Sequence, residues 1–148
     1  MNIENKAILI TGANRGIGRA LVDEALRRGV KKVYAGTRSA LEVADKRVTP
    51  LSLDVTDARQ VQQAVEQVDS LDVLINNAGI AIYDDLTNFE VIEKHLAVNF
   101  LGLLRVTQHS CRRSGVPKEP SSITCLWQGS RHCRSYLLTP LRKRPGST

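Results

Sequence analysis

The most constraining feature of this sequence is a glycine-rich segment directly after a short apolar run. Residues 7–10 have the composition of a buried strand, and Thr11–Gly18 then places glycines at positions 12, 16 and 18. Glycines at this spacing let the chain turn sharply, admit a phosphate close to the backbone and let the next helix pack tightly. A helix beginning here directs free N–H groups and its positive dipole end at the turn. The segment predicts a site for a dinucleotide pyrophosphate.

The residues after the glycines support that interpretation. Ile17, Leu21 and Ala25 share one face of an expected helix, and Gly29 stands where such a helix commonly ends. A glycine-rich turn is often only a turn. The strand before it and the helix after it therefore carry the argument.

The rest of the first hundred residues alternates strands and helices. We expect strands at residues 32–36, 48–54 and 72–76, and helices that begin near residues 56–57 and at Thr87. Pro50 cannot donate to a ladder, which places the strand 48–54 at a sheet edge, where the order 3-2-1-4-5-6 puts its third strand. The pattern predicts an α/β fold of Rossmann type, a doubly wound parallel sheet truncated after the fourth strand and helix.

The end of the second expected strand bears on the choice of cofactor. A site that prefers NAD places an acidic residue about 20 positions beyond the glycines, whereas an arginine there accommodates a 2′-phosphate. This chain has Thr37 and Arg38, with no carboxylate before Glu42, and Arg15 adds a cation inside the glycine turn. The alternative is that both arginines are solvated surface residues. The sequence favours NADP(H) over NAD.

Asn99 is an unexpected residue on the last expected helix. It shares a face with Leu96 and Leu103, and a buried amide is costly unless it is hydrogen-bonded. The spacing leaves two alternatives equally open, a structural asparagine satisfied by the backbone and a functional one.

Four motifs together resemble the short-chain dehydrogenase/reductase family over residues 6–108. They are T-G-x-x-x-G-x-G in Thr11–Gly18, Asp54-Val55, Asn76–Gly79 and Val98-Asn99. The resemblance implies hydride transfer between NADP(H) and a small carbonyl compound or secondary alcohol, and intact relatives that form homo-oligomers. The cofactor-binding residues that it implies are Gly12, Asn14, Arg15, Gly16, Ile17, Gly18, Thr37, Arg38, Asp54, Val55, Asn77, Ala78 and Gly79. Asn99 would be the asparagine of the family's catalytic tetrad.

The remaining members of that tetrad are missing. The family pattern requires a serine, then a tyrosine about thirteen residues on, with a lysine four residues after the tyrosine. The chain contains no Tyr-x-x-x-Lys, and Tyr136 is followed four residues later by Pro140. We therefore expect the chain as written to be inactive. An alternative is a non-catalytic fragment that binds a nucleotide.

The composition changes near Gln108. Residues 109–148 contain eight basic side chains, one acidic side chain, all three cysteines and the single tryptophan, so the net charge of +6 resides there. We expect residues 1–108 to be an NADP(H)-binding half-domain and residues 109–148 a basic tail, containing cysteines and prolines, that is disordered or poorly packed. A one-base frame shift near Gln108 explains the tail. Allowed codons in the shifted frame place a serine at Leu126, a tyrosine at Thr139 and a lysine at Lys143.

Other classes of function are disfavoured. The cysteines and histidines of residues 109–148 include no C-x-x-C pair, so we expect no metal site. The basic tail predicts weak, salt-sensitive contact with polyanions, without specific binding of nucleic acid or membrane. No apolar run approaches the ~20 residues of a membrane span, and the N-terminus does not resemble a signal peptide, which favours a cytoplasmic location.

Overall fold

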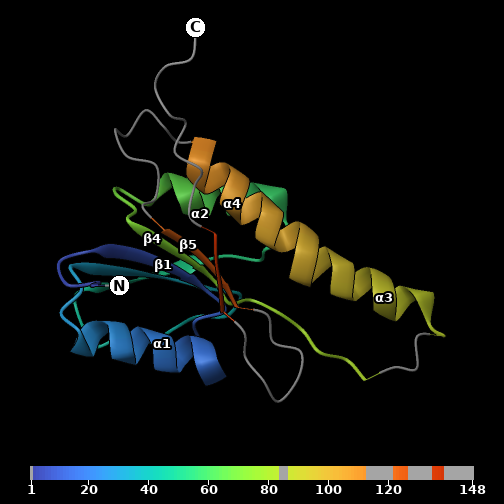
Figure 1. The fold of residues 1–148 in the computed structure, drawn as a ribbon, viewed down its shortest axis with the longest axis horizontal. Coiled ribbons are helices and arrows are strands. Elements are labelled where there is room, and N and C mark those ends of the chain that lie inside the picture. The colour runs from blue at the N-terminus through green and yellow to red at the C-terminus, as the bar shows by residue number, and fades with distance from the viewer. Residues whose placement is uncertain (1, 84–86, 113–121, 127–134, 139–148) are drawn as a thin grey trace, which may run out of the picture.

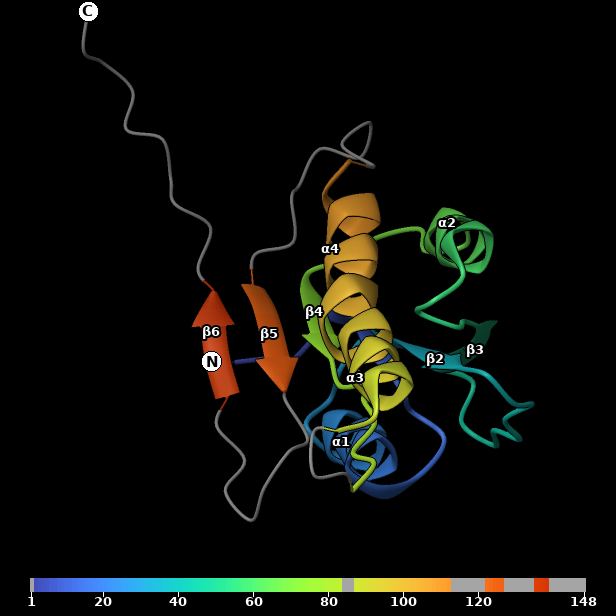
Figure 2. The same cartoon turned by 90° about the vertical axis from the view of Figure 1, so that its right-hand side faces the viewer.

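The apolar runs of the sequence form the strands of one sheet. The computed structural model describes residues 2–83, 87–112, 122–126 and 135–138. The strands are β1 (Ala7–Thr11), β2 (Lys32–Thr37), β3 (Val48–Ser52), β4 (Val73–Asn76), β5 (Ser122–Leu126) and β6 (Ser135–Leu138). Their order is β3-β2-β1-β4-β5-β6, with β1 to β5 parallel and β6 antiparallel to β5 (Figure 2).

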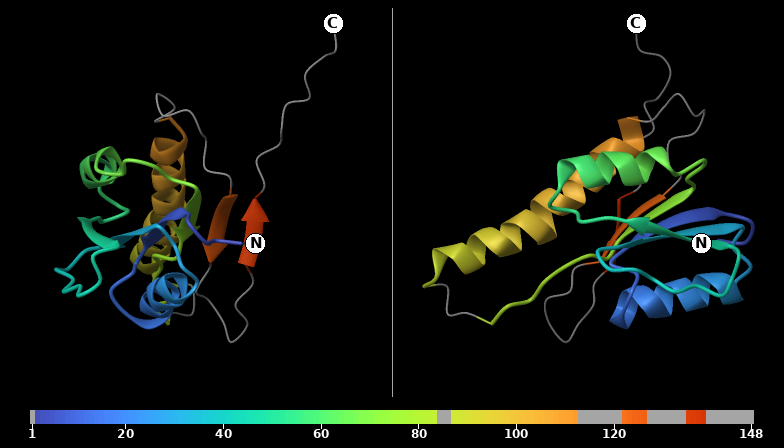
Figure 3. Two further views of the ribbon diagram at one scale, coloured as in Figure 1. Left: turned by 90° about the vertical axis from the view of Figure 1, so that its left-hand side faces the viewer. Right: turned by 180° about the vertical axis from the view of Figure 1, so that it is seen from behind.

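Helices cover both faces of this sheet. They are α1 (Gly16–Arg27), α2 (Ala58–Glu66), α3 (Phe89–His95), the π-helical segment η1 (Leu96–Gly102) and α4 (Leu103–Arg112). Helix α1 lies on one face, and α2 and α4 lie on the other (Figure 1). Segments α3, η1 and α4 follow one another as a single long rod (Figure 3). The predicted Rossmann-type arrangement, with strand order 3-2-1-4, is confirmed.

The alternation of side chains along β1 divides the core into two layers. Ala7 and Leu9 belong to the layer that also contains Val61 of α2 and Val106 of α4. Ile8 and Ile10 point to the other face, into the layer that contains Val22 and Ala25 of α1. Because both faces of a strand are covered, its sequence is continuously apolar instead of alternating. Strand β1 therefore contributes side chains to both layers of the core.

Local signals in the sequence fix several element ends. Gly29, at φ +75°, follows α1, and β3 with its Pro50 lies at the sheet edge, both as predicted. The Asp57 side chain accepts from the backbone N–H groups of Arg59 and Gln60 and caps α2. These bonds lower the pKa of the Asp57 carboxyl group, and the bond from the Gln60 N–H has the largest effect. Helix α3 begins later than predicted, because the Asn88 side chain caps it by accepting from the Glu90 N–H.

One expectation about the region beyond β4 is corrected. Truncation of the sheet after its fourth strand would leave β4 as an exposed edge, but β5 pairs with β4 in parallel and β6 pairs with β5. The composition change near Gln108 falls inside α4, which continues to Arg112. Much of the predicted tail lies outside the described residues, so its poor packing stays a prediction. In the described part of the chain, no helix has the length and apolar character required to span a membrane.

A buried tyrosine joins β2 to the loop before β4, and its hydroxyl offers a test of the packing. Tyr34 is fully buried, and its Oη accepts from the backbone N–H of Asp69 at 3.0 Å. Tyr34→Phe should lower the free energy of unfolding by about 1–3 kcal/mol, because it leaves that N–H without its acceptor. Urea denaturation measures the change. Tyr83→Phe is the matched control, since Tyr83 is 101% exposed, and an equal loss in both variants would contradict the expectation.

Candidate functional site

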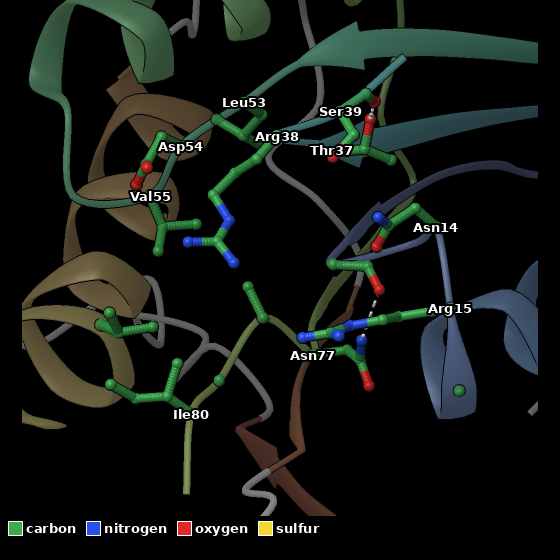
Figure 4. A pocket seen from close by; sticks show the side chains of 15 residues that line it. Asn14, Arg15, Thr37, Arg38, Ser39, Leu53, Asp54, Val55, Asn77 and Ile80 are labelled. Atoms are coloured by element: carbon green, nitrogen blue, oxygen red, sulfur yellow. Dashed lines mark hydrogen bonds between the residues drawn. The ribbon is translucent and has the colours of Figure 1, made fainter. Parts of the chain in front are cut away.

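The carboxyl ends of the parallel strands open into one cavity of about 440 Å³. This is where open α/β sheets bind their ligands. Figure 4 shows residues from several separate segments meeting there. The lining residues are Gly12, Asn14, Arg15, Gly16, Thr37, Arg38, Ser39, Leu53, Asp54, Val55, Asn77, Ala78, Gly79, Ile80 and Val98.

The glycines between β1 and α1 each meet a different demand. Gly12 and Gly16 have φ of +68° and +54°, in the left-handed region that glycine adopts without strain. A Cβ on Gly16 would meet nothing within 4 Å, so the backbone here stays open to a ligand. A Cβ on Gly18 would lie 2.0 Å from the carbonyl oxygen of Gly12, so only glycine lets α1 approach the turn this closely.

Hydrogen bonds lock the end of β1 to the end of β4. The Thr11 hydroxyl oxygen accepts from the backbone N–H groups of Asn77, at 3.0 Å, and Ala78, at 2.9 Å. In return, Asn77 Nδ2 donates to the carbonyl oxygens of Thr11 at 2.9 Å and Gly12 at 3.2 Å. The glycine turn and the Asn77–Gly79 segment are therefore held as one unit around the cavity.

Two arginines extend into the cavity from different elements. Arg15 precedes α1 and Arg38 follows β2, and both side chains are drawn in Figure 4. Neither arginine belongs to any ion pair found among the described residues. The one lining carboxylate, Asp54, accepts from the Thr56 N–H at 2.8 Å and the Thr56 hydroxyl at 2.6 Å. The cavity thus presents two guanidinium groups to an anion.

Asn99 bonds to the backbone on the other side of the cavity wall. Its Oδ1 accepts from the Ile80 N–H at 2.9 Å, and its Nδ2 donates to the Ile80 carbonyl oxygen at 2.9 Å. Both halves of the amide are satisfied by the backbone N–H and carbonyl oxygen of one residue, which is the structural alternative left open by the sequence. Asn99 lies in the π-helical segment η1 and does not line the cavity.

The cavity gathers most of the predicted site residues and adds others. Ile17, Gly18 and Asn99 are the predicted residues that do not line it, and Ile17 is 40% exposed. Sequence analysis missed the lining residues Ser39, Leu53, Ile80 and Val98, and also Thr11, which braces the turn. Each of the five is adjacent in sequence to a predicted residue, and this adjacency was the signal by which they could have been found. Among the described residues, no group of three His, Cys, Asp or Glu side chains could hold a metal ion.

Comparison with known proteins agrees with this geometry. The family model of the short chain dehydrogenases matches residues 6–115. The chain belongs to the short-chain dehydrogenase family. An uncharacterized oxidoreductase of Methylorubrum extorquens is 33% identical to the chain over 130 residues, and the match covers 76% of this chain and 52% of the relative. The chain spans between about a fifth and a half of the length of the first curated relatives it matches.

Solved structures of short-chain dehydrogenases share the fold. One from Burkholderia cenocepacia, in complex with NADP, superposes with a TM-score of 0.70 at 34% identity, covering 74% of this chain and 48% of that one. Another, from Leptospira borgpetersenii with bound NAD+, superposes with a TM-score of 0.68 at 24% identity. That match covers 76% of this chain and 47% of the Leptospira chain. In each comparison about half of the other chain has a counterpart here.

Proposed function

We propose that the cavity binds NADP(H) and that the chain is the cofactor-binding part of an oxidoreductase acting on a carbonyl compound or secondary alcohol. The observation that carries the proposal is the pair Arg15 and Arg38, which line one cavity where no carboxylate directly follows β2. An arginine at this strand end accommodates a 2′-phosphate. The solved relatives include one with NADP and one with NAD+, so the cofactor preference rests on these two side chains.

The residues at the start of α1 fit a pyrophosphate. Arg15 occupies the N-cap position without a side-chain capping bond, and the first turn contains no acidic residue. The free N–H groups and the positive end of the helix dipole are therefore available to an anion. Gly12 and Gly16 leave room for the phosphates to approach the backbone. Asp54 and Val55 would hold the adenine, and Asn77, Ala78 and Gly79 would lie along the rest of the cofactor.

The chain's own contribution to the reaction is to bind and orient. When bound, NADPH would supply a hydride from C4 of its nicotinamide to a carbonyl compound, and NADP+ would accept one there from a secondary alcohol. Asn99 fixes the peptide of Ile80 beside the cavity, and as the family's tetrad asparagine it would support a catalytic tyrosine and lysine. The sequence contains no Tyr-x-x-x-Lys, so no residue of that motif is available to donate a proton to the substrate oxygen. We therefore infer that the chain as written binds cofactor without turnover.

The residues after the family motifs have an explanation in the reading frame. We infer that residues 109–148 arise from a frame shift in an ordinary reductase gene. Allowed codons of the shifted frame give an apolar run, Gly-Ala-Ile-Val-Asn, over residues 119–123. This run overlaps the first two residues of β5, which pairs with β4, and the overlap supports the inference. The serine of that frame would stand at Leu126, the last residue of β5. Its tyrosine and lysine, at Thr139 and Lys143, fall outside the described residues.

The absence of Tyr-x-x-x-Lys from the sequence favours a second candidate function. With the cofactor cavity formed and the tyrosine and lysine missing, the chain would serve as a non-catalytic nucleotide-binding protein whose tail is a natural product. Sequencing of the coding DNA distinguishes the oxidoreductase from the non-catalytic binding protein. A frame that continues through Tyr-x-x-x-Lys supports the oxidoreductase, and a frame that ends quickly supports the binding protein.

Cofactor titration tests the proposed function directly. NADPH should bind the 148-residue chain more tightly than NADH, and Arg38→Asp should reverse the order. The loss for NADPH should be roughly tenfold to a hundredfold, because a charge-assisted hydrogen bond is removed and repulsion is added. Quenching of intrinsic fluorescence or calorimetry measures both affinities.

The matched control is Arg59→Asp, which makes the same charge change on α2 at an exposed residue outside the cavity. Its preference for NADPH should equal that of the unaltered chain. Equal affinity of the unaltered chain for both cofactors would refute the NADP(H) assignment.

A further inference from the structure

The segment that follows β4 has no regular secondary structure, yet it forms one wall of the cavity. Residues 77–83 lie outside all helices and strands, and Gly79 and Ile80 line the cavity. Beyond Ile80 the side chains point to solvent, with Ile82 44% and Tyr83 101% exposed. Burial of side chains therefore does not hold this end of the wall. Its position depends on hydrogen bonds to the backbone.

Two side chains of the α3–η1 rod provide these bonds. The Asn99 amide bonds to both the N–H and the carbonyl oxygen of Ile80, each at 2.9 Å. Four residues earlier, His95 Nε2 accepts from the Ile82 N–H at 3.0 Å. The segment after β4 runs alongside the rod in Figures 1 and 3. The rod thus bonds to the backbone of two alternate residues of the wall, Ile80 and Ile82.

The geometry of the two partners explains why the contacts occur in register. Four residues of a helix rise about 6 Å, and two residues of an extended chain span about 6.6 Å. Side chains one helical turn apart, such as His95 and Asn99, therefore reach the backbone of alternate residues of an extended segment. Bonds at one residue alone would let the segment pivot about that residue, whereas bonds at two alternate residues fix its direction.

The imidazole of His95 is prepared for this role by its own helix. His95 Nδ1 lies 2.8 Å from the carbonyl oxygen of Val91, one turn earlier. A carbonyl oxygen can only accept, so Nδ1 carries the proton. In the neutral ring Nε2 is then the acceptor, as the bond from the Ile82 N–H requires. The bond to Val91 therefore fixes the ring orientation and the tautomer that the bond from the Ile82 N–H requires.

We propose that His95 is a positioning residue for the cofactor cavity. By holding the Ile82 N–H it completes, with Asn99, a two-point attachment that fixes the wall formed by Gly79 and Ile80. Nothing else in the described residues accepts from the Ile82 N–H. The importance of the wall for binding rests on the proposed function, whereas the attachment itself does not. Substitution of His95 should therefore loosen the wall and weaken cofactor binding without unfolding the sheet.

The test uses the full 148-residue chain and three variants. His95→Leu keeps a side chain of similar bulk and removes both bonds, and His95→Gln keeps an amide that can accept and donate. Lys94→Ala is the control, since it alters an exposed neighbour on the same helix. Amide hydrogen exchange at Ile80 and Ile82 is measured without cofactor, NADPH affinity is measured by titration, and the melting temperature monitors the fold.

In His95→Leu we expect exchange at Ile82 to become at least about fivefold faster, the equivalent of one net hydrogen bond, with a smaller change at Ile80. NADPH affinity should fall by a similar factor, and His95→Gln should recover both. Unchanged exchange at Ile82, or an equal change in Lys94→Ala, would overturn the proposal. If the unaltered chain binds NADPH, faster exchange at Ile82 in His95→Leu without a change in NADPH affinity would also overturn the proposal. If the unaltered chain fails to bind NADPH, the proposed function fails, and the exchange result alone decides the attachment.

Discussion

Gly18→Ala should lower the free energy of unfolding by about 3 kcal/mol and weaken cofactor binding to the remaining folded chain. The new Cβ would lie 2.0 Å from the carbonyl oxygen of Gly12 and 2.6 Å from Nδ2 of Asn77. The first neighbour is backbone, so relief requires α1 to move away from the turn. That movement also disturbs the bonds that join Asn77 to Thr11. Urea denaturation with an unchanged m value measures the loss.

Gly16→Ala is the matched control for this prediction. Gly16 has a φ of +54°, so alanine there carries the strain of a left-handed conformation, about 1–2 kcal/mol. It meets no atom within 4 Å, so no steric term adds to the strain. The difference between the two variants isolates close packing from backbone conformation. A Gly16→Ala chain that loses as much stability as Gly18→Ala would contradict the account of Gly18.

The sequence predicted the fold where local patterns and tertiary packing agree. The unbroken apolar composition of β1 follows from coverage on both faces, and Pro50 is tolerated because β3 lies at an edge. Beyond β4, the amino-acid composition did not predict that another strand pairs with the sheet. Pairing of β5 with β4 uses backbone N–H and carbonyl groups, which every residue except proline offers. A stretch with unfavourable side-chain composition can therefore still form a ladder.

The site was predictable to the extent that it is built from glycine geometry and charge. Gly12, Arg15 and Arg38 each occupy positions set by a strand end, and strand ends follow from the apolar pattern. The attachment of His95 and Asn99 to the wall was not predictable in the same way. It joins residues 13 and 19 positions apart, and it depends on the angle at which the rod leaves the sheet. The sequence indicated only that Asn99 needed hydrogen-bond partners.

The chain as written should reduce no ketone or aldehyde at a measurable rate with NADPH. Asn99 can only support a tyrosine and a lysine, and the sequence offers no Tyr-x-x-x-Lys for it to support. Loss of a positioned general acid costs ~10²–10⁴ in rate. Insertion of one base near the codon for Gln108 should restore the serine, the tyrosine and the lysine together. The measurement compares the two proteins with NADPH against aldehydes and ketones, and with NADP+ against secondary alcohols.

The restored protein must also pass a test that separates chemistry from folding. Replacing its restored tyrosine by phenylalanine should remove turnover while NADPH affinity stays the same, because the cofactor cavity is formed by residues before the break. A restored protein that remains active without the tyrosine would contradict the assigned chemistry. Turnover by the 148-residue chain, or a restored frame that soon meets a stop codon, would contradict the frame shift. In the second case the cavity with its two arginines would stand as a binding site, since its lining residues do not depend on the reading frame after Gln108.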